Sequence, residues 1–252
     1  MNYSINTDRG KRKDNQDSTA TFFNQSNVLL AILCDGLGGH QAGDIASEMA
    51  VSQIGNSWEQ TTFTSKDTYI IQTWLKGVIN RENTRIFKAA NTYPDLEGMG
   101  TTLVASVVLE QQVLFANIGD SRAYTYKDNE LTLITQDHSF VAELQRSGEL
   151  TELEAKNHVN RNALTRSLGV EGELDIDFFK VLKDSIDLVL LNSDGLSNTL
   201  SKEQMIDALN SNHDLDQKAV DLVDLAIRNE ASDNVTVNLI SVQSDSLDGV
   251  GE

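Results

Sequence analysis

The stretch Val28-Leu29-Leu30-Ala31-Ile32-Leu33-Cys34, followed at once by Asp35-Gly36, decides how the rest of this sequence is interpreted. An apolar run of this length, bounded by polar residues and glycine, predicts a buried or half-buried β-strand. Three more such runs lie beside an aspartate: 113–119 before Asp120, 188–193 before Asp194, and 235–240 after Asp233. The sequence therefore predicts four strands with a carboxylate at one end of each.

Four carboxylates at strand ends form a common site if neighbouring strands bring those ends to one rim. Like charges held that close repel one another, and they protonate unless a cation neutralises them. Carboxylate and carbonyl oxygens are ligands that Mg²⁺ and Mn²⁺ prefer. Each Asp-Gly or Asp-Asn pair taken alone also fits an ordinary turn. Their joint occurrence leads us to predict a divalent-metal centre.

Composition and charge restrict the classes of function. The chain has 252 residues, of which 39% are hydrophobic, and its formal net charge is −18. This charge argues against a nucleic acid or an anionic membrane surface as a partner bound through a general basic field. We see no signal peptide, and no apolar run approaches the ~20 residues that span a bilayer. We therefore expect a cytoplasmic protein, and we expect the single cysteine, Cys34, to be packed and inert.

Strand and helix patterns come in clusters rather than in strict alternation. Strands are expected at 18–23 with 28–34, 101–109 with 113–118, 123–126 with 131–134, and 178–191 with 235–242. Helices are expected at 44–54, 68–90, 201–209 and 215–227. Short polar turns between apolar runs predict antiparallel hairpins. The pattern favours an α+β fold with helices covering antiparallel sheets, in one domain at 1–242 with a polar, acidic tail at 243–252.

Two further stretches carry chemistry. Arg9-Gly10-Lys11-Arg12-Lys13 is the densest basic cluster of an acidic chain. It fits a solvated loop, and it also fits a clamp for phosphate, whose oxygens guanidinium binds in pairs. The glycines after Asp35 lack the GxGxxG spacing of a dinucleotide loop, and no P-loop lysine is present. They are better explained by close backbone approach to something that Asp35 binds.

As an ordered set, these motifs are similar to those of the metal-dependent PPM/PP2C protein Ser/Thr phosphatases. The set is Arg12…Asn15-Gln16-Asp17, Asp35-Gly36-Leu37-Gly38-Gly39-His40, Gly98-Met99-Gly100-Thr101-Thr102, Gly119-Asp120-Ser121-Arg122, Ser193-Asp194-Gly195-Leu196 and Ser232-Asp233-Asn234-Val235-Thr236. The segment at about 137–169 resembles the flap of the short bacterial members. The resemblance implies an αββα sandwich of two antiparallel sheets flanked by helices, with this flap beside the active site.

The resemblance also implies ligands for the metal ions. Asp35 would bridge two ions, Mn²⁺ or Mg²⁺, and Asp194 and Asp233 would complete the first of them. Gly36 would give its carbonyl oxygen to the second ion, with Asp17 contributing through bound water. These ligands would hold the two ions that the family uses.

Three more positions bear on the site. Asp120, together with Asp194, matches the third metal position of bacterial members. Arg12 lies five residues before Asp17, which is the spacing of the family's phosphate-binding arginine. Many eukaryotic members have glutamate where this chain has Gln16, so the second ion would be held mostly by water.

The group that protonates the leaving alcohol has no clear match. Eukaryotic members carry a histidine for this role where this chain has Leu37. His40 fits either that role or an oriented polar residue at a helix start. A metal-bound water is the other source of the proton.

The implied function is hydrolysis of phosphoserine and phosphothreonine in proteins, by direct attack of a water that bridges two divalent ions. Phosphorylated Ser/Thr proteins are then the substrates, and a Hanks-type kinase is the opposing enzyme. Two alternatives stay open. One is a catalytically silent regulatory module of the same fold, which the retention of Asp35, Asp194 and Asp233 disfavours. The other is a hydrolase of small phosphomonoesters. We expect a monomer.

Overall fold

The structure of the chain, a computed structural model, describes residues 1–38 and 42–242. The predicted tail at 243–252 and His40 lie outside the described residues. None of the helices in these two segments has the length and the apolar character needed to traverse a bilayer.

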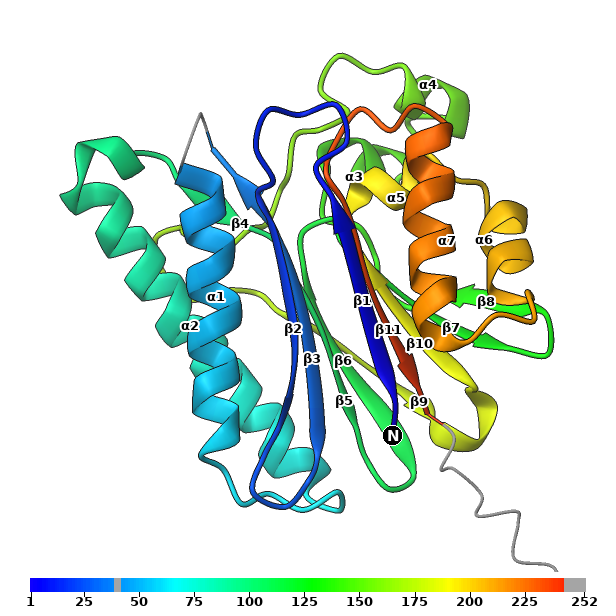
Figure 1. Ribbon diagram of the computed structural model, residues 1–252. Coiled ribbons are helices and arrows are strands. Elements are labelled where there is room, and N and C mark those ends of the chain that lie inside the picture. The colour runs from blue at the N-terminus through cyan, green and yellow to red at the C-terminus, as the bar shows by residue number, and fades with distance from the viewer. Residues whose placement is uncertain (39–41, 243–252) are drawn as a thin grey trace, which may run out of the picture.

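Two antiparallel sheets form the centre of the molecule (Figure 1). The first has the strand order β1-β11-β10-β7-β8. Its strands are β1 (Tyr3–Asp8), β7 (Arg122–Lys127), β8 (Glu130–Leu133), β10 (Leu188–Asn192) and β11 (Val235–Ser241). The second has the order β2-β3-β5-β6-β9, with β4 paired to β3. Its strands are β2 (Asp17–Phe23), β3 (Leu29–Leu37), β4 (Gly100–Thr101), β5 (Leu103–Val108), β6 (Gln112–Ile118) and β9 (Asp177–Leu182).

Helices cover the outer face of each sheet, which confirms the predicted αββα sandwich (Figure 1). The second sheet is covered by α1 (Ala42–Glu59) and α2 (Thr68–Thr92). The first is covered by α5 (Asp194–Ser197), α6 (Lys202–Leu209) and α7 (Leu215–Arg228). Two short helices, α3 (Phe140–Arg146) and α4 (Glu152–Lys156), belong to the predicted flap, and η1 (Pro94–Leu96) and η2 (Lys183–Ser185) are 3-10 turns.

The apolar run of β3 is continuous because both faces of the strand are buried. Side chains alternate across a strand, so neighbours in sequence enter different cores. Leu30, Ile32 and Cys34 pack in the core beneath α1 and α2. Leu29, Ala31 and Leu33 pack in the core between the two sheets. This single strand therefore joins the helix layer to the inter-sheet layer.

Local signals in the sequence were reliable guides to the ends of several elements. A Ser201–Gln204 capping box begins α6, whose range was predicted at 201–209, and a Thr151–Glu154 box begins α4. The predicted hairpin at 127–130 joins β7 to β8, and its residues Asp128 and Asn129 have φ of 49° and 65°. Such positive values are typical of the tight turns that join antiparallel strands.

Two aspects of the strand prediction were wrong. Strand β1 was not expected, because its side chains are mostly exposed at the edge of a sheet and Ser4 is its only buried residue. The region 178–191 is not one strand unit, because η2 separates β9 from β10 and the two strands join different sheets. Helix α1 also runs on to Glu59, beyond the expected end at residue 54.

Asn83 of α2 fastens this helix to the loop that follows the flap. Its side chain is fully buried, and its Oδ1 accepts the backbone N–H groups of Gly169 at 2.8 Å and Val170 at 3.0 Å. Its Nδ2 donates to the carbonyls of Val170 and Gly172, both at 3.0 Å. One amide thus satisfies four backbone groups of a loop that has no sheet to pair with.

We predict that Asn83→Ala lowers the free energy of unfolding by about 2–4 kcal/mol, because buried backbone groups lose their partners. Asn91→Ala is the matched control, since Asn91 is exposed on the same helix and bonds only to the Phe87 carbonyl. Urea unfolding of both variants measures the difference. Equal losses in the two variants would contradict the role given to Asn83.

Candidate active site

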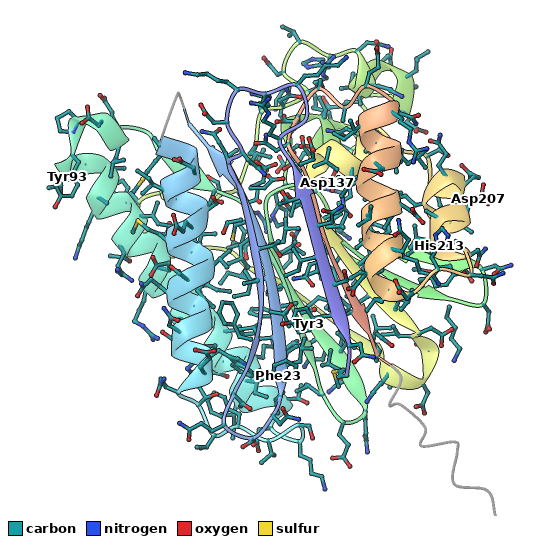
Figure 2. The ribbon with its side chains drawn as sticks, in the orientation of Figure 1. Tyr3, Phe23, Tyr93, Asp137, Asp207 and His213 are labelled. Atoms are coloured by element: carbon teal, nitrogen blue, oxygen red, sulfur yellow. The ribbon has the colours of Figure 1, made fainter. Side chains whose placement is uncertain are left out.

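A pocket of about 190 Å³ lies at the end of the sandwich where the flap sits. It is lined by Arg12, Gln16, Asp35, Gly36, Leu37, Gly38, Asp120, Asn162, Leu164, Asp194, Asp233 and Asn234. Figure 2 shows Asp137, at the base of the flap, near this end of the strands, whereas Tyr3 and Phe23 lie toward the opposite end. All four aspartates that the sequence places at strand ends line this one pocket.

Strand direction explains why the four carboxylates meet. Strands β3 and β6 both pair antiparallel with β5, so they run in the same direction and carry Asp35 and Asp120 to one edge. Strand β10 ends where its antiparallel partner β11 begins, so Asp194 and Asp233 meet at the corresponding edge of the other sheet. The rim therefore receives carboxylates from both sheets.

Threonines fix the backbone around Asp35. The Asp35 carbonyl accepts the Thr101 hydroxyl and the Thr102 N–H, both at 2.9 Å. The Asp35 N–H donates to Thr102 Oγ1, also at 2.9 Å. At the next position, a Cβ on Gly36 would lie 2.2 Å from the carbonyl oxygen of Gly43 and would not fit. The strand end is thus held firmly, and only glycine allows helix α1 to approach it.

Asp17 lies beside Asp35 in the register of β2 and β3, and it does not line the pocket itself. Its Oδ2 accepts the Ser193 hydroxyl at 2.7 Å. Its Oδ1 is buried without a hydrogen-bond partner. Ser193 comes from the end of β10, so this bond joins the two sheets directly behind the rim.

Arg12 stands at the mouth of the pocket and forms an ion pair with Asp233, with 2.6 Å between Nη2 and Oδ2. Its side chain is 54% exposed. Asn234 holds the loop that carries it, because its Nδ2 donates to the carbonyls of Arg9 at 2.9 Å and Asp14 at 3.0 Å. Asn234 Oδ1 also accepts the Gln16 N–H at 2.9 Å. The basic loop is therefore ordered against the acidic rim.

Burial and mutual repulsion raise the pKa values of the rim carboxylates. Burial, followed by repulsion from Asp120 and Asp233, raises the pKa of Asp194 to about 8. Burial likewise raises the pKa of Asp17 to about 6 and, with repulsion from Asp137, that of Asp120 to about 6. Burial and neighbouring aspartates raise the pKa of Asp35 well above its ordinary value. The single guanidinium of Arg12 lowers the pKa of Asp194 only in part.

The donor set fits a hard divalent cation. Asp194 Oδ1, like Asp17 Oδ1, is buried and unpartnered, and such oxygens are costly unless something positive reaches them. Across the described residues, no three acidic, histidine or cysteine side chains are yet close enough to hold one ion as they stand. The two unpartnered oxygens are therefore the observation that supports a cation at this rim.

Most of the predicted site residues come together. The pocket is lined by Arg12, Asp35, Gly36, Asp120, Asp194 and Asp233. Asp17 is adjacent through Asp35, and Gln16 and Leu37, the two departures from the family pattern, also line the pocket. The role of each residue stays a prediction.

Sequence reasoning missed the groups that support these residues. Thr102, Ser193 and Asn234 had been noted as parts of motifs without any role, although each holds a predicted ligand or its loop. The flap residues Asn162 and Leu164 line the pocket, and only the flap as a whole had been expected there. The sequence signal that could have pointed to Thr102, Ser193 and Asn234 was their position inside the motifs.

The raised pKa values predict how stability depends on pH in chelator-treated protein. Carboxylates whose pKa is about 6 or about 8 when folded, against ~3.9 when unfolded, bind more protons in the folded state. Their contribution is complete below about pH 4 and is lost as pH rises through the folded values. We therefore expect the melting temperature to fall by roughly 10 °C between pH 5.5 and pH 8.5.

The control for this experiment is Asp194→Asn, which keeps the size of the side chain and removes its titration. The variant should lose less stability over the upper part of the same pH range, because residue 194 no longer titrates and its charge no longer raises the pKa of Asp35. Scanning calorimetry with a chelator present measures both. A parent protein that gains stability on going to pH 8.5 would contradict the assigned shifts.

Comparison with known proteins agrees with the family resemblance of the sequence motifs. The sequence model of the family described as "Protein phosphatase 2C" matches residues 8–225. The protein named serine/threonine phosphatase stp of Listeria welshimeri serovar 6b is 43% identical over 243 residues, which are 95% of this chain and 95% of that protein. The crystal structure of serine/threonine phosphatase Stp1 from Staphylococcus aureus has a TM-score of 0.91 and 34% identity, and covers 96% of this chain and 95% of its own.

A further solved structure bears on the acidic rim. It is titled as the catalytic domain of the serine threonine protein phosphatase PstP in complex with 2 manganese ions. Its TM-score is 0.77 at 33% identity, and the alignment covers 94% of this chain and 96% of that one. A protein of the same fold thus holds two divalent ions.

Proposed function

This chain belongs to the protein phosphatase 2C family, and on that premise we propose that it hydrolyses phosphoserine and phosphothreonine in proteins with divalent metal ions. One observation carries the proposal: Asp35, Asp120, Asp194 and Asp233 line a single pocket with Arg12. Clustered carboxylates suit metal ions, and a guanidinium suits the phosphoryl group. The two kinds of group are neighbours here, as a phosphate ester bound to metal requires.

The proposed ligands follow the family pattern and the chemistry of this rim. Asp35 would serve two ions, with Asp194 and Asp233 on the first, and Gly36 and Asp17 on the side of the second. The unpartnered oxygens of Asp17 and Asp194 support this assignment. Asp120 and Asp194 would serve a third ion. Mn²⁺ and Mg²⁺ both prefer such oxygen ligands.

Bound divalent ions would supply Lewis-acid chemistry that activates water and offsets phosphoryl charge. The residues of the chain would bind and position the substrate. Arg12 binds the equatorial phosphoryl oxygens from the mouth of the pocket, and Asn234 keeps its loop in place. Asn162 and Leu164 of the flap also line the pocket, and the peptide part of a substrate would lie against them.

No side-chain nucleophile is needed for this reaction. Cys34 is fully buried in the core under α1 and α2, and burial raises the pKa of its thiol. A protonated, inaccessible thiol does not attack phosphorus. We therefore propose direct hydrolysis without a phosphoenzyme. The kinase partnership, the monomeric state and the cytoplasmic location stay predictions.

The first test is phosphate release from a phosphothreonine peptide with Mn²⁺, with Mg²⁺ and with EDTA. We expect release with either ion, none with EDTA, and a loss of at least about a hundredfold in Asp35→Asn. Asp207→Asn is the control, because Asp207 is exposed on α6, away from the rim (Figure 2).

The outcomes separate the proposed function from its alternatives. A folded protein that binds metal and releases no phosphate would favour a silent regulatory module. Rapid release from a small aryl phosphate, with none from the peptide, would favour a phosphomonoester hydrolase. Undiminished peptide hydrolysis by Asp35→Asn would show that the site is assigned wrongly.

The phosphate-binding role of Arg12 has its own test. Arg12→Ala should raise KM for the peptide about tenfold, because a charged hydrogen bond to the phosphoryl group is lost. Lys13→Ala removes the same charge from the same loop, and Lys13 does not line the pocket. Steady-state kinetics of both variants decide the matter. A similar change in the two variants would reduce the role of Arg12 to general attraction of anions.

A further inference from the structure

His138 lies at the base of the flap and is 2% exposed. Its ring Nδ1 accepts the backbone N–H of Gly119 at 3.1 Å. Its own backbone N–H donates to the Gly119 carbonyl at 3.0 Å. Gly119, the residue before Asp120, is therefore held on both sides by one residue of the flap.

The hydrogen bonds define the protonation of the His138 ring. Because Nδ1 accepts from Gly119, the ring proton lies on Nε2, which faces Asp177 Oδ2 at 3.1 Å. Asp177 Oδ1 in turn accepts Arg166 Nη1 at 3.0 Å. Burial, opposed in part by Asp177, lowers the pKa of His138, so the ring is neutral. The imidazole is thus oriented at both nitrogens.

The backbone at this position also holds the flap segment 162–165. The His138 carbonyl accepts the Thr165 N–H at 2.9 Å, and Ser139 forms a β-bridge with Leu164. Asn162 and Leu164 line the same pocket as Asp120. His138 therefore stands between the segment 162–165 and the Gly119–Asp120 turn.

The Asp120 side chain depends on this turn for its direction. Within the described residues, no other side chain donates a hydrogen bond to its carboxylate. Gly119 has φ of +102°, and a Cβ there would lie 2.6 Å from Thr102 Cγ2, so the turn has little room to change. What fixes the Gly119 backbone therefore also fixes the point from which the Asp120 side chain extends.

We propose that His138 is a positioning residue that holds Asp120 and the flap segment 162–165 in one arrangement. Its Nδ1 sets the Gly119–Asp120 turn, and Asp177 and Arg166 set the ring. The metal part of this inference rests on the proposed function, in which Asp120 is a metal ligand. By linkage, metal binding at Asp120 then changes the placement of the flap, and flap contacts change metal affinity.

Two substitutions separate the contacts of the ring. In His138→Asn the side-chain oxygen takes the place of Nδ1 and still accepts from Gly119. In His138→Gln the amide nitrogen takes the place of Nε2 and still donates toward Asp177, while the acceptor for Gly119 is lost. His213→Gln is the control, because His213 is exposed and pairs with Asp221, which belongs to α7.

The first readout is hydrogen exchange of the Gly119 amide without metal, which does not depend on the proposed function. We expect exchange about tenfold faster in His138→Gln, and unchanged exchange in His138→Asn and in His213→Gln. The second readout is Mn²⁺ calorimetry. The weakest Mn²⁺ site should lose about 10- to 100-fold in affinity in His138→Gln and be restored in His138→Asn.

A third readout uses the unaltered protein and so does not require any variant to fold. Titration with Mg²⁺ should shift the amide resonances of Gly119 and Thr165 along one binding curve. Equal effects of the Asn and Gln variants on Mn²⁺ affinity, or a Thr165 resonance that ignores Mg²⁺ while Gly119 responds, would overturn the proposal. If the parent protein binds neither ion, the proposed function fails, and the exchange of Gly119 alone still tests the His138 contact.

Discussion

Burial of β3 on both faces is the constraint on which the rest of the molecule depends. One face of this strand packs under α1 and α2, and the other packs against the first sheet. A strand buried in this way must be apolar throughout, and its first charged residue marks the point where the layers end. That residue is Asp35. The neighbouring strands reach the same limit, so the favourable burial of the layers offsets the repulsion between carboxylates gathered at their edge.

Neutral polar groups hold several parts of the rim in place. Thr102 bonds to both backbone groups of Asp35, and Asn234 gathers the loop that carries Arg12. Ser193 takes one oxygen of Asp17 and leaves the other without a partner. Neutral donors of this kind fix direction without cancelling charge. The rim is thereby preorganised for a cation that the chain itself does not supply.

Features that depend on local chemistry could be predicted from the sequence, and features that depend on distant partners could not. The strand at β3, the capping boxes at Ser201 and Thr151, and the hairpin turn at Asp128 have short-range causes. The edge strand β1 has almost no buried face, and the choice of separate sheets by β9 and β10 depends on partners far along the chain. For the site, spacing was enough to gather the four aspartates. The spacing of the motifs did not predict the contact between His138 and Gly119. This contact joins the Gly119 turn to a flap segment whose sequence is typical of a surface loop.

The two sheets contribute to the rim in equal measure. Asp35 and Asp120 follow strands of one sheet, whereas Asp194 and Asp233 adjoin strands of the other. The distance between these two pairs of carboxylates therefore depends on how the two sheets are aligned. A small slide of one sheet over the other, too slight to expose any apolar surface, would pull the pairs apart. Packing of Phe115, Val189 and Leu191 in the inter-sheet core therefore sets the spacing of the carboxylates as well as stabilising the fold, although none of these residues lines the pocket.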